Sequence, residues 1–372
     1  MKLGKYIKEY SVRNKQLRDI PVYSVTNSVG LTRPEEYFNK TIHSEDLRNY
    51  KIVKRNMIAF NPVNIKIGSV VVQDAEDEVL VSPLYTVFEV DTTKLDPYYV
   101  VAFLRSPSGL QKVLSKTTGS VRIVLKYSGL CDIDIPMPSL AEQRHIVQCL
   151  NAVQESIDRA SHRMVLYDKL VKSRFIELFD VQKCQKKTLG ECTDFVDYRG
   201  HTPELSDAGT IRMVNAKSVG KGFFKYVDEY VTEETYDSWM HRGFGYPGDI
   251  LFVTEGHTFG NTCLIPNDLK KFALGQRVIT IKGHQEVLNA FLCSYMQTDM
   301  FWKDINVYRT GGTAQGIRSK DLVKVYVPIP PLEQQKQCAA FVEQTDKSKL
   351  ATTETLKYLE ELKAALMSQY FG

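Results

Sequence analysis

The sequence predicts an α+β protein in which two related α/β domains are separated by two long antiparallel helices that resemble a coiled coil. Three observations support this fold class. A block of Gly, Pro and Gln residues occurs twice along the chain, β-rich segments precede each copy, and a long uninterrupted helical pattern follows each copy. A chain ordered as domain, helix, domain, helix can adopt pseudo-two-fold symmetry, which suits a ligand that itself has two related halves.

The repeated block keeps a constant spacing. Pro136 falls on Pro328 and Gln143 falls on Gln335, an offset of 192 residues that also places Thr118 on Thr310. The alternative is a chance similarity between two unrelated α/β domains. Glycine, proline and glutamine recurring at the same offset favour a true repeat. The repeat divides the chain into a first domain at 1–137, a first helix at 138–180, a second domain at 181–330 and a second helix at 331–372.

The globular segments have the same predicted order of elements. Short runs rich in Val, Ile, Tyr and Phe predict strands, and each set is followed by a helix with a glycine beyond its end. In the first copy the strands are Met57–Phe60, Ser69–Gln73 and Tyr85–Val90, with a helix at Pro97–Lys116. In the second copy they are Asp249–Val253, Thr262–Ile265 and Val278–Lys282, with a helix at Asn289–Tyr308.

The first long helix has a clear start and a regular apolar seam. Ser139 and Glu142 form a capping box, in which each side chain bonds the backbone N–H of the other residue. Apolar residues then alternate at spacings of three and four, a heptad pattern that requires a partner helix. At 1.5 Å per residue the helix is about 60 Å long. The predicted pairing residues on this helix are Ile146, Leu150, Val153, Ile157 and Met164.

The second long helix has a weaker seam. Leu356, Leu359 and Leu366 supply an apolar stripe near its C-terminus, whereas Lys349 and Thr352 interrupt the middle. The other copy is the obvious partner, and the chain order favours an antiparallel pair. A helical hairpin that only stabilises the fold is the alternative interpretation.

Composition sets broad limits on function. The net charge of +4 permits a polyanionic partner without demanding one. The seven cysteines form no Cys-x-x-Cys pair, which favours reduced thiols over a disulfide framework or a zinc site. There is no apolar run long enough to span a membrane and no signal-peptide core, so we expect a cytoplasmic protein without membrane contact.

The sequence offers no motif for catalysis. Gly243–Gly248 matches G-x-G-x-x-G but leads into a strand, so a turn is the better interpretation. Asn61-Pro62-Val63-Asn64 lacks the aromatic residue of an amino-methyltransferase loop, and the seven histidines show no metal-ligand spacing. We therefore expect no catalytic residue, no metal site and no cofactor in this chain.

Polar and basic loops are the remaining candidates for binding. Arg, Asn, Gln and Thr side chains pair with base edges and phosphates, and glycines allow close approach of the backbone. For any single residue a solvated loop is the alternative interpretation. The predicted DNA-binding residues are Arg13, Asn14, Lys15, Thr118, Gly119, Arg122, Tyr198, Arg199, His201, Thr310, Gly311, Thr313 and Gln315.

The repeated Thr-Gly and Pro-x-Pro-x-Leu-x-x-Gln block before a long helix resembles the specificity subunit of type I restriction–modification systems. The copy from Thr310-Gly311-Gly312 to Gln335 looks very like the family pattern, and the first copy departs from it at Ser139 and at Val121-Arg122-Ile123. The resemblance implies two target recognition domains that each read one half of a bipartite, asymmetric DNA site.

The resemblance also implies partners. The two helices of such a subunit act as a spacer and dock two methyltransferase subunits, which hold S-adenosylmethionine, while restriction subunits use ATP and Mg. This chain itself would be non-catalytic. Two other classes stay open: a stand-alone DNA methyltransferase or nuclease with a divergent site, and a bivalent protein scaffold.

Overall fold

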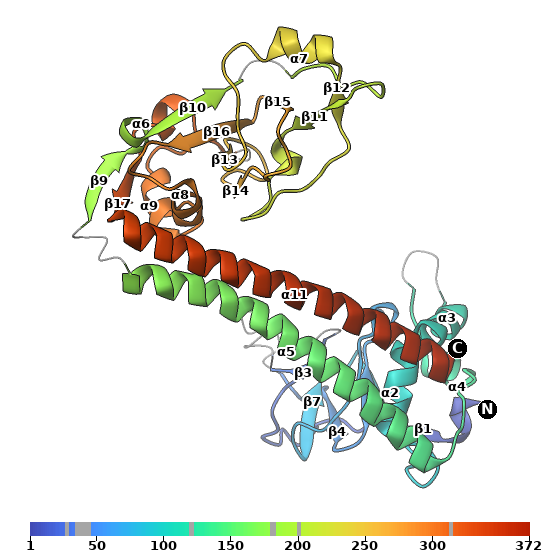
Figure 1. Cartoon of the computed structure of the whole chain (residues 1–372). Coiled ribbons are helices and arrows are strands. Elements are labelled where there is room, and N and C mark those ends of the chain that lie inside the picture. Colours follow the sequence, from blue (N-terminus) through green and yellow to red (C-terminus); the bar gives the residue numbers. More distant parts are fainter. Residues whose placement is uncertain (27–29, 34–45, 119–122, 179–183, 199–201, 312–314) are drawn as a thin grey trace. The chain divides into compact units, whose positions relative to one another are not determined.

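The computed structural model describes residues 1–26, 30–33, 46–118, 123–178, 184–198, 202–311 and 315–372 (Figure 1). The chain divides into two compact units. Unit 1 comprises residues 1–162 and 353–372, and unit 2 comprises residues 163–352. Each unit therefore contains one globular part, a segment of the first long helix and a segment of the second.

Unit 1 is built around a four-stranded antiparallel sheet in the order β1-β8-β5-β6. The predicted strands are confirmed to within one residue at each end. The strands of this sheet are β1 Ile7–Glu9, β5 Ile58–Phe60, β6 Val70–Val72 and β8 Thr86–Val90. Two further pairs of strands are β2 Ser24–Val25 with β3 Leu31–Thr32, and β4 Lys51–Lys54 with β7 Glu78–Val81. Short helices are η1 Leu3–Lys5, η2 Ile65–Ile67 and α4 Tyr127–Cys131.

Unit 2 contains the same sheet in the same order, β10-β16-β13-β14. Its strands are β10 Thr193–Asp197, β13 Ile250–Val253, β14 Thr262–Leu264 and β16 Val278–Gly283. The last three lie 192 residues after β5, β6 and β8, which confirms the repeat. Further elements are β9 Gln185–Thr188, β11 Ile211–Val214, β12 Tyr230–Val231, β15 Phe272–Leu274, β17 Tyr326–Ile329, η3 Ala216–Ser218, α6 Leu189–Cys192, α7 Glu233–Trp239 and α10 Ser319–Leu322.

The helix after each sheet is interrupted, so the single helices predicted at Pro97–Lys116 and Asn289–Tyr308 are wrong. Unit 1 has α2 Pro97–Arg105 and α3 Pro107–Ser115, and unit 2 has α8 Asn289–Tyr295 and α9 Asp299–Ile305. The break falls at equivalent residues, Ser106 and Thr298, which are extended and whose hydroxyls accept the backbone N–H three residues on. Their capping bonds start a second helix at a new angle. In unit 1, Pro107 reinforces the break because proline disfavours a helical residue before it.

The glutamine of the repeated block stabilises each unit in the same way. Gln143 accepts the N–H of Asp96 (2.8 Å) and donates to the carbonyls of Lys94 (3.0 Å) and Pro138 (2.9 Å). Gln335 makes the equivalent bonds to Leu288 (2.9 Å), Glu286 (2.9 Å) and Pro330 (2.8 Å). Both side chains are fully buried. Each glutamine thus joins the start of a long helix to the N-terminus of the helix after the sheet.

The long helices are α5, Leu140–Leu178, and α11, Leu332–Phe371. The predicted capping box is present, since the Ser139 N–H donates to Glu142 (2.8 Å) and the Glu142 N–H to Ser139 Oγ (3.3 Å). Within each unit the two helices lie side by side and run antiparallel (Figure 1). In unit 1, Gln154 of α5 contacts Lys363 of α11, and in unit 2, Asp168 of α5 contacts Lys349 of α11.

The predicted seam residues are the ones that the helix pair covers. In unit 1, Ile146 and Leu150 are buried in one core with Phe371 and with the half-buried Leu366. Val153, Ile157, Leu356 and Leu359 are half-buried in unit 1, as is Met164 in unit 2.

The polar residues in the second seam find partners, which the sequence pattern did not predict. Lys349 pairs with Asp168 at 2.8 Å, and Lys363 donates to Gln154. Burial lowers the pKa of Lys363. The hydroxyl of Thr352 donates to the carbonyl of Ser348 in its own helix (2.9 Å) and needs no other partner. Lys349 and Thr352 therefore lie in the middle of the seam with their polar groups bonded to other groups of the helix pair.

Each globular core is completed by an aromatic ring from the distal end of a long helix. In unit 1, Phe371 of α11 lies with its ring centroid 5.4 Å from Tyr99 and 5.8 Å from Phe103. In unit 2, Phe175 of α5 lies 5.9 Å from Phe291 and 6.4 Å from Tyr295, the residues 192 positions after that pair. Phe371 and Phe175 are both fully buried. The helix that follows one domain thus supplies a core residue to the other domain.

Candidate nucleic-acid interface

The late glycine-containing loop has the same closure in both units. The N–H and C=O of Thr118 bond those of Val124, each at 3.0 Å, and Thr310 and Gly316 exchange equivalent bonds at 2.9 and 3.0 Å. Each bridge closes a loop of five residues, 119–123 or 311–315. Gly311 has φ +98°, a conformation that favours glycine. The side chains of Thr118 and Thr310, where the two loops begin, are exposed.

A second loop packs beside the late loop in each unit. The N–H of Leu125 bonds the carbonyl of Pro62 (3.1 Å), and the N–H of Ile317 bonds that of Thr254 (2.9 Å). In unit 2 the contact is extended, because the Gly256 N–H donates to the Gln315 carbonyl (3.0 Å). The side chain of Gln315 is half-buried. In each unit the loop after β5 or β13 therefore lies beside the late loop, which precedes the repeated Pro block. These two loops form a common edge.

Basic side chains border this edge in unit 2. Arg277 Nε lies 3.0 Å from Glu255 Oε1, and Arg309, next to Thr310, is exposed together with His257. Arg318 and Lys324 both pair with Asp321. The hydrogen bond from Lys324, and to a smaller extent the one from Arg318, hold the pKa of the Asp321 carboxyl below its usual value. Arg277, Arg309 and His257 are not among the predicted binding residues, although Arg309 stands at the start of the predicted late loop. Their position beside glycine turns was the available signal.

The early loop of unit 2 lies near the late loop. Ser319 donates from its hydroxyl to Asp197 at the end of β10. Tyr198, however, is 1% exposed. Its hydroxyl donates to the Gly243 carbonyl and accepts the Arg242 N–H, both at 2.7 Å, and burial raises its pKa. The structure gives Tyr198 a packing role instead of the predicted DNA contact, because its only polar atom is already bonded to backbone.

The early loop of unit 1 likewise contains a buried residue among the predicted DNA-binding residues. Asn14 is 1% exposed, and its amide bonds both the N–H and the carbonyl of Arg18 (2.9 and 3.0 Å). Asn14 therefore holds its own turn rather than facing a ligand, contrary to the prediction. Arg13 and Lys15 are exposed, and Arg13 donates to Asn49 (3.2 Å). Their assignment to DNA stays a prediction, and Gly119, Arg122, Arg199, His201 and Thr313 lie outside the described residues.

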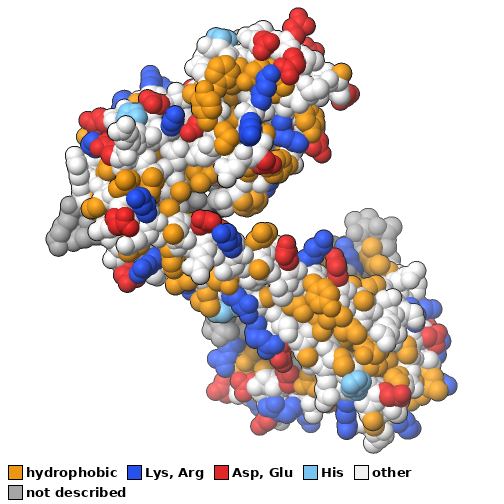
Figure 2. Space-filling view, in the orientation of Figure 1, with side chains coloured by type: hydrophobic (Ala, Val, Ile, Leu, Met, Phe, Trp, Pro, Cys, Tyr) orange, Lys and Arg blue, Asp and Glu red, His pale blue; other side chains and the backbone are white. Residues whose placement is uncertain are grey.

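Charge on the visible face agrees with contact through loops rather than through a broad basic field. Figure 2 shows Lys and Arg side chains interspersed with Asp and Glu over both units. A mixed surface of this kind contributes little to non-specific attraction of a polyanion. Binding strength and selectivity would then depend on a few loop residues.

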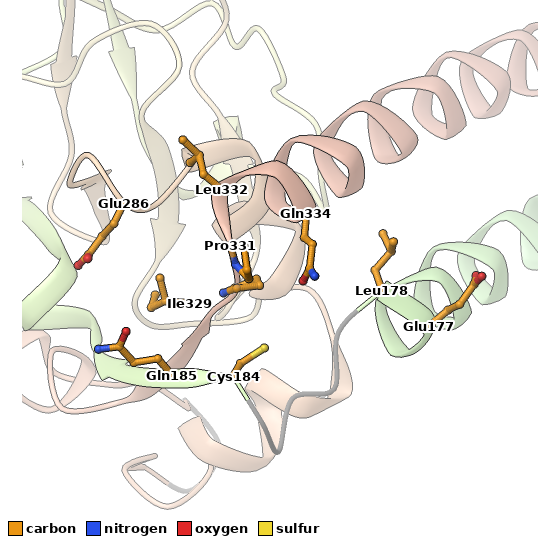
Figure 3. A pocket seen from close by; sticks show the side chains of 10 residues that line it. Glu177, Leu178, Cys184, Gln185, Glu286, Ile329, Pro331, Leu332 and Gln334 are labelled. Carbon is orange, nitrogen blue, oxygen red and sulfur yellow. The ribbon is translucent and has the colours of Figure 1, made fainter.

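An open hollow in unit 2 does not have the character of a nucleic-acid site. It lies where α5 ends and α11 begins (Figure 3), and it is lined by two carboxylates, Glu177 and Glu286, with apolar residues such as Leu178 and Ile329. Negative charge disfavours a phosphate backbone. In the part of the chain that the structure describes, no group of acidic, His and Cys side chains could hold a metal ion. None of the described helices is long and apolar enough to cross a membrane.

Comparisons with known proteins agree with this arrangement. Residues 183–363 match the family described as the type I restriction modification DNA specificity domain. A Methanocaldococcus jannaschii protein named as the MjaX type I restriction enzyme specificity subunit is 22% identical over 89% of this chain and 82% of its own length. The specificity subunit of Escherichia coli EcoR124I/EcoR124II is 24% identical over 64% of this chain and 60% of its own length. The resemblance found in the repeated block is thereby confirmed.

Solved structures show the same fold. A chain from a study of complex assembly and conformational transition of the type I restriction–modification system gives a TM-score of 0.61 at 16% identity, covering 100% of this chain and 96% of that chain. The S subunit of a type I system from M. genitalium gives 0.60 at 15% identity, with 100% and 95% covered. Two α/β domains with two long helices are therefore confirmed as the fold class.

Proposed function

We propose that this chain, a relative of type I restriction–modification specificity subunits, is the subunit that selects the DNA sequence in such a system. Each globular part reads one half of a bipartite, asymmetric site, and the two long helices dock two methyltransferase subunits. Restriction subunits join the same complex in the cytoplasm. The chain itself is non-catalytic: S-adenosylmethionine belongs to the methyltransferase subunits, and ATP and Mg belong to the restriction subunits.

One observation supports this proposal above the others. The same pair of loops is built at equivalent positions in both units, closed by the same backbone bonds at Thr118 and Thr310, yet the two copies carry different side chains. Backbone repetition with side-chain divergence fits a protein that contacts two half-sites of different sequence. Base edges are read by side chains, while the loop framework only positions them.

The first test separates recognition from catalysis. We expect the purified full-length chain to transfer no labelled methyl group from S-adenosylmethionine to DNA, and to support methylation of a bipartite site when modification subunits are added. The modification subunits without this chain serve as the control. Methyl transfer by the chain alone would instead establish a stand-alone enzyme. Absence of DNA binding at low salt, with binding of protein partners only, would establish a scaffold.

The second test addresses the two half-sites. Replacing Gln315 or Arg199 by alanine should relax the bases of one half-site, and replacing Arg13 or Arg122 should relax the other. Loss of a side chain that bonds a base edge should change affinity about 5- to 150-fold at one base pair, whereas loss of a phosphate contact should weaken all sequences alike. Sequencing of methylated adenines in cells carrying each variant reads the outcome. Asn14→Ala, which loosens a turn, should leave the pattern of selected bases unchanged, and relaxation in the opposite half-site would reject the assignment.

A further inference from the structure

A short hairpin in unit 2 lies between η3 and β12 and is not one of the named strands. Val219 and Phe224 form a bridge, and the N–H of Gly220 bonds the carbonyl of Phe223 at 2.8 Å. The tip is formed by Lys221 and Gly222, and Gly222 has φ +83°, which a residue with a side chain rarely adopts. We refer to residues 219–224 as the tip hairpin.

The tip hairpin is fixed to the edge already described. The N–H of Gly222 bonds the carbonyl of Thr262 at 2.9 Å, and the amide of Asn261 donates to the carbonyl of Val219 at 3.0 Å. Asn261 ends the loop that begins at Thr254 and bonds the late loop at Gln315, and Thr262 is the first residue of β14. The tip hairpin and the late loop therefore border the same loop in unit 2, one at each of its ends.

The exposed side chains of the tip hairpin and the next residue are aromatic and basic. Phe223 is 56% exposed, although most phenylalanines of this chain are buried. Lys221 and Lys225 are exposed, and Lys225 Nζ lies 5.4 Å from the centre of the Phe223 ring. Neither lysine is paired with a carboxylate among the described residues. From Val219 to Val227 the sequence contains no acidic residue.

Among the described residues, the acidic groups beside this segment form no ion pair with Lys221 or Lys225. Glu229 pairs with Lys217 and accepts from Asn215, and Asp268 accepts from the Tyr226 hydroxyl at 2.7 Å. Asp228 lies 3.4 Å from Arg212, whose guanidinium is 4.9 Å from the Tyr230 ring. The positive charge of Lys221 and Lys225 is therefore left for an external anion.

We propose that the tip hairpin is a DNA-contacting element of unit 2, in which Phe223 packs against bases or sugars while Lys221 and Lys225 contact phosphates. This inference rests on the proposed DNA-binding function and adds residues to its site. An apolar ring between two cations complements an apolar base surface flanked by phosphates. Apolar wedges and aromatic platforms are common in proteins that contact DNA in this way.

Among the described residues of unit 1, the segment that the repeat aligns with the tip hairpin offers no equivalent group. In unit 1 the sequence repeat aligns Gly30 with this region, and the described residues that follow it are Leu31, Thr32 and Arg33. Arg33 lies 3.5 Å from Glu76 and over the ring of Tyr23, so its charge is already partnered. We therefore expect the contact to be made in the half-site that unit 2 reads.

The test uses the full-length chain and two fluorescein-labelled duplexes. One carries the methylated site identified by methylome sequencing, and the other has that site scrambled. Affinity is measured by anisotropy over a series of salt concentrations for Phe223→Ala and for the double variant Lys221→Gln/Lys225→Gln. The matched control is Tyr326→Ala/Lys186→Gln, which removes an exposed aromatic and an exposed lysine from the β9–β17 pair of the same unit. Thermal unfolding checks that each variant is folded.

The two variants should weaken DNA binding in different ways. The lysine double variant should reduce the slope of log K against log salt by about 1.8, because about 0.9 is lost for each phosphate contact. Phe223→Ala should weaken binding about 5- to 150-fold with the slope unchanged. The control should bind like the wild type. Wild-type affinity and slope in both variants would overturn the inference alone, whereas a wild-type chain that binds neither duplex would overturn the proposed function and this inference with it.

Discussion

Replacing Phe371 by alanine is expected to lower the free energy of unfolding of unit 1 by about 3–5 kcal/mol, the usual cost of removing a buried aromatic side chain. The ring is 2% exposed and lies between Tyr99 and Phe103, so its loss leaves a cavity in the centre of the core. Tyr358→Ala, on an exposed position of the same helix segment, should cost little.

The equivalent change in unit 2 is Phe175→Ala, for which a matched control stands next in the chain. Phe175 is 1% exposed and contacts Phe291, whereas Ile176 is 69% exposed. We expect Phe175→Ala to lower the stability of unit 2 by a similar amount and Ile176→Ala to have almost no effect. A chain of two units need not unfold in one step. A probe of local stability is therefore more informative than a single midpoint of thermal unfolding.

Hydrogen exchange provides that probe. Phe371→Ala should accelerate exchange of the amides of β5 and β8, and Phe175→Ala those of β13 and β16. Each variant should leave the other unit's sheet protected to the wild-type level. Equal loss of protection in both units, or no loss in either, would contradict the assignment of each ring to one core.

Replacing Gln143 or Gln335 by leucine should be nearly as damaging, for a different reason. Each glutamine is fully buried and satisfies one backbone N–H and two backbone carbonyls. Leucine has a similar volume but leaves these three groups without partners at a cost of about 1–3 kcal/mol each. We expect a loss of several kcal/mol from the unit that contains the substitution.

Exposed glutamines on the same helices are the controls for this result. Gln148→Leu on α5 and Gln344→Leu on α11 should leave stability within about 0.5 kcal/mol of wild type, because both side chains face solvent. Exchange of the Asp96 amide in Gln143→Leu and of the Leu288 amide in Gln335→Leu reports the broken bond directly. If those two amides stay protected, the glutamines do not hold the helix N-termini and the interpretation is wrong.

The candidate site was predicted in outline from the sequence. The constant offset between Thr118 and Thr310 identified the late loops, because a repeat conserves the residues that close a turn. The same reasoning failed for Asn14 and Tyr198. Both residue types are common in nucleic-acid interfaces, but an amide can equally hold its own turn and a phenol can bond backbone carbonyls. Residue type alone does not distinguish an outward side chain from a buried one.

By itself the sequence determined the repeat, three strands along each domain, the start of α5 at its capping box and the seam from Ile146 onward. These features depend on local spacing, which a single chain displays directly. Only the tertiary structure decided that Gln143 and Gln335 bridge to distant helix N-termini, that Lys363 meets Gln154, and that Phe371 and Phe175 complete their cores. Those contacts join residues far apart in the chain, and their energies depend on burial, which no local pattern encodes.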